Sequence, residues 1–185
     1  MPERSSPVPP PRAAQILERR TRALAARGAA AKPGAPPVTV LVCTLGGELY
    51  GIPLNAAAQV VPDAPCTALP GAPPALLGLI GQGGQVWILL DLALALGRAA
   101  PVAPGGHALL LRASPRPVAL RVDRVAGVFS LVPVAAGDGG HAEGAVSGHA
   151  PAPPELAAGG RALVGLIDPA RLLQPFLASA VLPGA

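Results

Sequence analysis

Most of the residues that could do chemistry in this sequence surround a glycine-rich stretch, GLIGQGGQVWILLDLALALG, which runs from Gly78 to Gly97. A P-loop needs a lysine and a hydroxyl residue after its last glycine, and neither follows Gly84. The dinucleotide fingerprint G-x-G-x-x-G can begin at Gly81, but position 86 is valine and the next residues favour a strand over a helix. A strand, a glycine turn and a second strand form a hairpin, so we predict a tight turn and no phosphate site.

The other candidates for catalysis have equally poor patterns. The stretch GAVSGH resembles a nucleophile elbow, but its first glycine lies three residues before Ser147 where the motif requires two. His141 and His149 lie eight residues apart in a glycine-rich segment, which is not the spacing of zinc ligands. Cys43 and Cys66 stand alone, and we interpret them as free thiols. We therefore predict a protein without a catalytic residue, metal site or cofactor.

Two aspartates occupy matching positions in the chain. A shift of 77 residues lays VWILLDLALAL, from Val86, over LVGLIDPARLL, from Leu163. In each segment an apolar strand ends in an aspartate, Asp91 or Asp168, and a short helical turn follows. A carboxylate at that position can accept hydrogen bonds from the first free N–H groups of the turn. We predict that both aspartates are structural N-caps and take no part in acid–base chemistry.

The elements around these residues form a second, longer repeat. The stretches VTVLVCTL and LYGIPL, joined by GGE, read as a hairpin, and HALLLRA and PVALRVD, joined by SPR, read as another. A shift of 68 residues pairs Asn55 with Asp123 and Ala58 with Ala126 without a gap. Closely spaced short strands without long helices indicate an all-β fold. We expect two small β-barrels packed together, one from subdomain 38–97 and one from subdomain 106–174, because closure removes exposed edge strands.

The positive charge lies almost entirely in an N-terminal arm, residues 1–37. Between Met1 and Gly34 the chain carries six Arg and one Lys against two Glu, or +5, whereas the remainder carries seven Arg against eight acids, or −1. The arm is rich in proline and is expected to be mostly disordered, with one possible helix over residues 12–27. That helix has a narrow apolar face, so we interpret it as solvated, with a docking or membrane-surface helix as the alternative.

No segment of the sequence predicts a membrane span or a signal peptide. The start, MPERSSPVPPP, has no apolar h-region. The longest apolar run, Val86 to Leu96, has 11 residues and contains Asp91, whereas a transmembrane helix needs about 20. We expect a soluble, cytoplasmic protein.

Several blocks of the body together resemble the CheW-like chemotaxis coupling domain. They are LVCTLGGELYGIPLNAAAQVV, LPGAPPALLGLIGQGGQVWILLDLALALG and PVALRVDRVAGVFSL, and the likeness extends over about Val38 to Gln174 in the same order and spacing. The resemblance implies two tandem five-stranded SH3-like β-barrels with short helices. It also implies a non-enzymatic adaptor between the cytoplasmic tip of a chemoreceptor and the regulatory domain of a histidine kinase.

Two charged residues typical of that family are replaced here. The family's arginine after the second block's first strand falls on Gly83, and a glutamate near the end of the first helical turn falls on Gln59. Those two charges are expected to pair across the family's partner-binding surface, and here both are lost. Loss of only the glutamate or only the arginine would leave an uncompensated charge, so the fold tolerates the loss of both charges better than the loss of one. We expect the fold to survive and the receptor-docking surface to be altered.

The resemblance places the altered surface at four positions. They are Gln59, Gly78, Gly83 and Gly84. We expect small residues such as Gly78 to permit close approach of a partner's barrel. The alternative is that these positions serve turn and packing geometry alone, since glycine in hairpins usually serves the backbone.

Two further interpretations stay open beside the adaptor. A degenerate member of the family could compete for partners or act as a scaffold outside chemotaxis. The second interpretation is a nucleic-acid-binding barrel with a basic arm. Proteins that bind single strands stack the bases on aromatic side chains. The aromatic residues of this chain are only Trp87, Tyr50, Phe129 and Phe176. The body also lacks the surplus of cations that displaces counterions from nucleic acid, since its seven Arg stand against eight acids.

Overall fold

The computed structural model describes residues 36–62, 65–98, 105–112, 116–134, 144–157 and 162–178. The chain divides into two units, Met1–Pro33 and Gly34–Ala185, and every described residue belongs to the second. The predicted arm helix over residues 12–27 therefore lies outside the described residues, as does His141.

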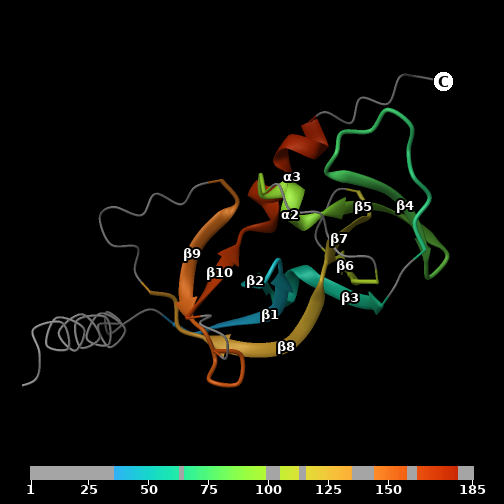
Figure 1. Cartoon of the computed structure of the whole chain (residues 1–185). Coiled ribbons are helices and arrows are strands. Elements are labelled where there is room, and N and C mark those ends of the chain that lie inside the picture. Colours follow the sequence, from blue (N-terminus) through green and yellow to red (C-terminus); the bar gives the residue numbers. More distant parts are fainter. Residues whose placement is uncertain are drawn as a thin grey trace, which may run out of the picture. The chain divides into compact units, whose positions relative to one another are not determined.

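The described residues form ten strands and three short helical elements (Figure 1). The first half contains β1 Val38–Leu45, β2 Glu48–Pro53, the 3-10 turn η1 Leu54–Ala56, β3 Ala57–Pro62, β4 Leu76–Gln82, β5 Gln85–Asp91 and α2 Leu92–Ala95. The second half contains β6 His107–Leu111, β7 Val118–Val122, β8 Arg124–Leu131, β9 Val146–Pro151, β10 Leu163–Ile167 and α3 Pro169–Ala178. The predicted all-β class is confirmed.

The glycine-rich stretch that begins at Gly78 forms a hairpin, as predicted. Strands β4 and β5 pair antiparallel up to Gln82 and Gln85, which leaves Gly83 and Gly84 as a two-residue turn. Their φ angles are +59° and +74°, in the left-handed region that glycine adopts without strain. Two consecutive residues with positive φ match the twist of the flanking strands, which is the geometry of a tight hairpin. The next element is a strand, so the turn does not lead into a helix.

The ten strands form two five-stranded sheets that exchange strands between the repeats. Sheet A has the order β8-β1-β2-β10-β9 and sheet B the order β3-β6-β7-β5-β4. Each sheet thus combines the first hairpin of one repeat with the last three strands of the other. This corrects the expectation that subdomains 38–97 and 106–174 each close a barrel of their own. Sequence similarity between repeats identifies equivalent strands, but the pairing partner of a strand is set by packing in three dimensions.

The pairings confirm the two sequence shifts residue by residue. The exchanged strands pair in parallel, with Gly165 opposite Tyr50 in sheet A and Ile88 opposite Val118 in sheet B. These two pairs are related by the shifts of 68 and 77 residues. In sheet A the ring of Tyr50 fills the space over Gly165, where an added Cβ would lie 3.2 Å from the ring. A large and a small residue in one sheet therefore replace two medium residues in the other.

Each sheet is also closed by one isolated bridge in matching places. Thr67 follows β3 and pairs with Leu79 of β4 through two backbone hydrogen bonds of 2.8 Å. Val134 follows β8 and pairs with His149 of β9, where the Val134 N–H donates to the His149 carbonyl at 2.9 Å. Each bridge links the continuation of one outer strand to the other outer strand. The sheets are therefore closed into barrels, and unpaired edges are reduced.

Three clusters of buried side chains stabilise the body. One lies on the sheet A side and includes Val42 and Val164, and another lies on the sheet B side and includes Leu110 and Ala119. A third and larger cluster combines residues of both hairpins and both α-helices, such as Ile52, Leu120 and Leu172. Because this shared core is apolar and draws on both sheets, the two barrels are held together as one body.

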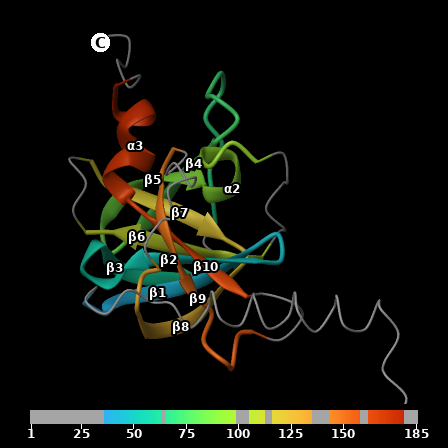
Figure 2. The same ribbon diagram turned by 90° about the vertical axis from the view of Figure 1, so that its left-hand side faces the viewer.

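The two predicted N-caps are present at the starts of the α-helices. Asp91 is buried and accepts a hydrogen bond from the Leu94 N–H at 3.1 Å, while Asp168 accepts from the Ala170 N–H at 2.9 Å. Helices α2 and α3 lie at the same end of the body in both views (Figure 1, Figure 2). Matching capping at both sites agrees with the repeat.

Helix α3 extends further than the sequence predicts. The predicted domain ends at Gln174 and a tail of residues 175–185 follows, but α3 continues through Pro175 to Ala178. Proline inside a helix removes one hydrogen bond, which favours an earlier end. Phe176 and Leu177 pack against the shared core, and that burial compensates for the lost hydrogen bond.

Candidate interaction surface

A groove of about 820 Å³ lies where the chain passes from sheet A to sheet B. It is formed by β1, β2, η1, β9 and β10 together with the residue that follows β6. Its lining is apolar apart from one cation and three neutral polar residues. The lining residues are Val38, Thr39, Val40, Gly51, Pro53, Leu54, Asn55, Arg112, Ser147, Leu166 and Ile167.

The crossing segment at this groove is held by backbone contacts, while its side chains face outward. The Arg112 N–H donates to the Ala56 carbonyl at 2.8 Å, which ties the end of β6 to η1. The Arg112 guanidinium reaches the Ala57 carbonyl only at 3.4 Å and is exposed. Leu54 is 40% exposed and contributes apolar surface to the groove. The groove thus offers apolar surface beside an accessible cation.

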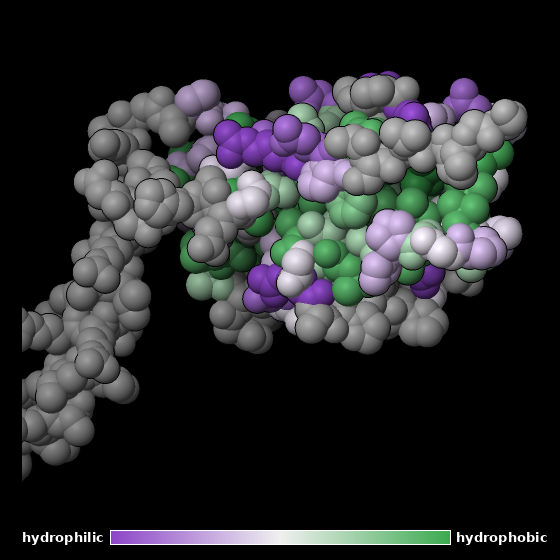
Figure 3. Space-filling view, turned by 90° about the horizontal axis from the view of Figure 1, so that it is seen from above, coloured by the Kyte–Doolittle hydropathy of each residue, from purple (hydrophilic) through white to green (hydrophobic). Residues whose placement is uncertain are grey.

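Apolar side chains are exposed elsewhere on the body as well. Figure 3 shows one face on which hydrophobic side chains spread across the middle, with hydrophilic ones at its margins. Large hydrophobic side chains with substantial exposure occur on several elements. They are Leu69, Val86, Val128, Val132 and Leu163, in addition to Leu54 of the groove. Scattered exposure of this kind is common, and contiguous patches indicate binding surfaces.

None of the four predicted partner-binding residues is among the described residues that line the groove. Gln59 is exposed on β3, whereas Gly83 and Gly84 are exposed at the β4–β5 turn. Gln59 lies on β3 and Gly83 in the turn that follows β4, and β3 and β4 are the two outer strands in the order of sheet B.

Gly78 differs from the expectation of a partner-facing residue. It is buried, has φ of +149°, and lies under the segment that bridges onto β4. A Cβ added there would meet the Thr67 carbonyl oxygen at 2.1 Å and the Cys66 Sγ at 2.8 Å. The small residue is required inside the barrel, because it lets Thr67 approach β4. The close approach that sequence reasoning assigned to a partner is made by this chain's own backbone.

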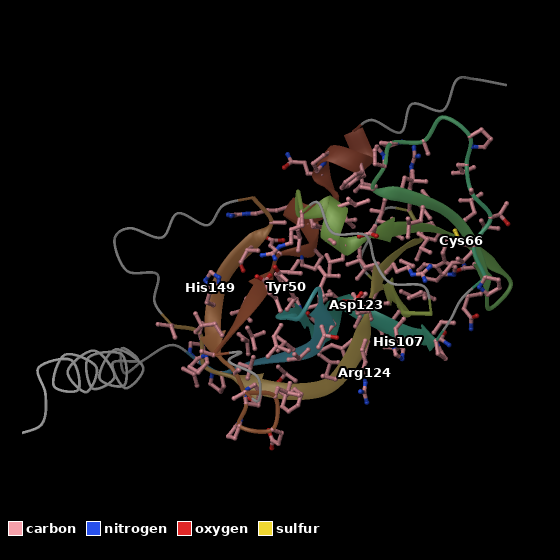
Figure 4. All side chains as sticks on the ribbon, viewed as in Figure 1. Tyr50, Cys66, His107, Asp123, Arg124 and His149 are labelled. Carbon is pink, nitrogen blue, oxygen red and sulfur yellow. The ribbon has the colours of Figure 1, made fainter. Side chains whose placement is uncertain are left out.

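The groups that could do chemistry are dispersed among the described residues. No three His, Cys, Asp or Glu side chains in the described part of the chain gather to hold a metal ion. Cys66 and His149 lie on opposite sides of the body in Figure 4. Burial raises the pKa of the Cys43 thiol to about 12, and the nearby Asp123 adds to this shift. Such a thiol stays protonated and is a poor nucleophile at neutral pH.

One polar cluster joins β2 to the end of α2. The Tyr50 hydroxyl donates to Glu48 at 2.8 Å, Arg98 forms an ion pair with Glu48, and the guanidinium lies 5.5 Å from the centre of the Tyr50 ring. Burial, followed by the hydrogen bond to Glu48, raises the pKa of Tyr50 to about 12. The Glu48 and Arg98 side chains are about half exposed, so this cluster adds only modest stability.

Comparisons with known proteins identify one family and one fold. The family model described as CheW-like domain matches residues 39–175. The chain is similar to the crystal structure of the scaffolding protein TtCheW from Thermoanaerobacter tengcongensis, with a TM-score of 0.57 and 21% sequence identity over 71% of this chain and 89% of that one. No curated protein matches the sequence. Within the described ranges, no helix has the length and hydropathy that a membrane crossing requires.

Proposed function

Because the chain belongs to the CheW-like domain family, we propose that it is a non-catalytic adaptor that couples chemoreceptors to a chemotaxis histidine kinase in the cytoplasm. The observation that carries this proposal is the family match over residues 39–175, which includes strands of both barrels. In this proposal the protein acts by binding alone.

The construction of the body supports a bridging role. The shared core joins β1 and β2 to β6 and β7, so the barrels are one packed unit and not two domains on a linker. An adaptor of this kind can hold two partners at a fixed separation without the ordering cost of a flexible connection. The exposed side chain of Leu54 and the partly buried Val38 and Leu166 provide apolar surface in the groove for such binding.

The receptor-facing surface is proposed to be altered. Gln59, Gly83 and Gly84 are exposed and uncharged, whereas the family pattern has a glutamate and an arginine at the first two positions. A charged pair at an interface contributes specificity and association rate. Its absence favours either a different receptor or an adaptor whose kinase side is retained and whose receptor side is weakened. A competitor that displaces other adaptors is the second candidate, supported by the same two replacements.

Co-sedimentation tests this function and separates its two forms. Membranes that contain a chemoreceptor of the same cell are mixed with the kinase, with and without this protein. A bridging adaptor increases the amount of kinase that sediments with the membranes. A competitor lowers the amount that a conventional adaptor brings down. If the protein changes neither quantity, the chemosensory role is wrong.

A further inference from the structure

The chain crosses between the two sheets at two places, and the 68-residue repeat relates these crossings. At the first crossing along the chain, η1 connects β2 of sheet A to β3 of sheet B. At the second, Asp123 connects β7 of sheet B to β8 of sheet A. Under the shift, Asn55 corresponds to Asp123 and Arg112 corresponds to Thr44. The two crossings can therefore be compared atom by atom.

The crossing at Asp123 is closed by a carboxylate of the chain itself. The Asp123 N–H donates to the Thr44 carbonyl at 3.2 Å, and the Asp123 carboxylate accepts from the Gly46 N–H at 2.7 Å. The Thr44 hydroxyl donates to the Arg124 carbonyl at 3.4 Å. This crossing thus contains an acid that is held by the turn of the facing hairpin.

The crossing at Asn55 has a different set of charges. The acid is replaced by the neutral amide of Asn55, and the hydroxyl residue by the cation of Arg112. Both side chains are exposed and both line the groove. Compared with its counterpart, this crossing lacks the carboxylate of Asp123, has Ala56 in place of Arg124, and carries the guanidinium of Arg112.

We propose that the groove binds a segment of a partner protein that presents one carboxylate among apolar side chains, and that Arg112 recognises the carboxylate. This inference rests on the proposed function as a binding protein and names the chemistry of one docking surface. The partner's acid supplies the charge that Asp123 supplies at the other crossing. Its apolar neighbours contact Val38, Leu54 and Leu166.

Charge complementarity selects this occupant over the nearest alternative. Among the described residues of the lining, Arg112 is the only ionisable one, and none of them is an acid that could neutralise it. The N-terminal segment Met1–Gly34 of this chain carries +5, and its like charge disfavours it as the ligand of Arg112. Guanidinium presents planar, paired donors that match a carboxylate. Because Arg112 is exposed, we expect a two- to five-fold effect on affinity, which is about 0.5–1 kcal/mol.

Peptide titrations followed by NMR test the proposal on the full-length protein. The ¹⁵N-labelled chain is titrated with Ac-LELL-NH2 and with Ac-LQLL-NH2 at low ionic strength. We expect the amide signals of Thr39, Leu54 and Asn55 to shift, and the glutamate peptide to bind about two- to five-fold more tightly than the glutamine peptide. The preference should disappear in Arg112→Gln and remain in Arg124→Gln, which removes an exposed cation outside the groove.

A charge reversal makes the test specific. In Arg112→Glu the protein should prefer Ac-LKLL-NH2 to Ac-LELL-NH2. Absence of shifts around the groove, or an unchanged preference for glutamate in Arg112→Gln, would overturn the proposal. Kinase binding is measured separately, so its loss would contradict the proposed function, whereas failure of the peptide test alone would contradict only the assignment of the groove.

Discussion

The carboxylate of Asp123 accepts a hydrogen bond from the N–H of Gly46 at 2.7 Å, across 77 positions of sequence. Gly46 lies in the turn of the β1–β2 hairpin, and Asp123 lies where the chain leaves sheet B for sheet A. The contact therefore fixes the exchanged arrangement of the two repeats at one of its crossing points.

Replacement of Asp123 by alanine should destabilise the protein by about 1 kcal/mol, because the turn loses a charge-assisted hydrogen bond near the surface. Urea unfolding followed by far-UV circular dichroism measures this free energy. Asn55→Ala, at the equivalent exposed position, is the control and should change it by less than about 0.5 kcal/mol. If the two substitutions lower the free energy of unfolding equally, the hydrogen bond to Gly46 does not stabilise the protein.

Gly78→Ala should destabilise the protein by about 3 kcal/mol or more, because a Cβ there clashes with the Thr67 backbone and the residue has positive φ. Gly81→Ala, on the same strand, meets nothing within 4 Å and should cost about 1 kcal/mol at most. Thermal and urea unfolding of both variants check the difference. If the two alanine variants are equally stable, the close approach of Thr67 is contradicted.

Tyr50 is the only tyrosine in the chain, so ultraviolet titration at alkaline pH reports its ionisation alone. The folded protein should titrate with a pKa of about 12, above the ordinary value of 10. Since the folded-state pKa is the higher one, this contribution to stability is complete below about pH 10 and is lost as the pH rises toward 12. Glu48→Gln should lower the pKa of Tyr50, and Tyr50→Phe should remove the transition. An ordinary pKa in the folded state would contradict the buried, hydrogen-bonded hydroxyl.

The two cysteines should differ in their reaction with a thiol reagent at pH 8. Cys66 is exposed, and partial desolvation raises the pKa of its thiol, so it should react more slowly than free cysteine. Cys43 is fully buried and has a pKa of about 12, so it should react only after unfolding. The Cys66→Ser variant should therefore show no reactive thiol until denaturant is added. Rapid labelling of that variant in the native state would argue against the buried position of Cys43.

The local features of the fold could be read from the sequence because they depend on neighbouring residues. Paired glycines specify the β4–β5 turn, and an aspartate after each closing strand specifies an N-cap. The repeat could also be read from the sequence. The structure agrees with it down to the equivalence of Ala58 and Ala126, because each of these residues lies at an irregularity in its strand pairing. These signals require no knowledge of which strands meet.

The exchange of strands and the groove depend on long-range packing and were not predictable in the same way. The repeat shows that β5 resembles β10, but it does not show that β5 pairs with β7 and β10 with β2. The groove brings together residues of well-separated segments, such as Val38, Arg112 and Leu166. Gly78 was expected to face a partner because the cause of its small size, the backbone of Thr67, lies eleven residues earlier.

The most direct test of the adaptor role is titration calorimetry of this protein against the regulatory domain of a chemotaxis-type histidine kinase from the same cell. The full chain and a variant that lacks residues 1–34 are both measured, since the body forms a compact unit of its own. We predict micromolar binding that is retained without the N-terminal segment. Absence of binding in both forms would contradict the coupling function, and binding that requires residues 1–34 would place the interaction outside the CheW-like domain.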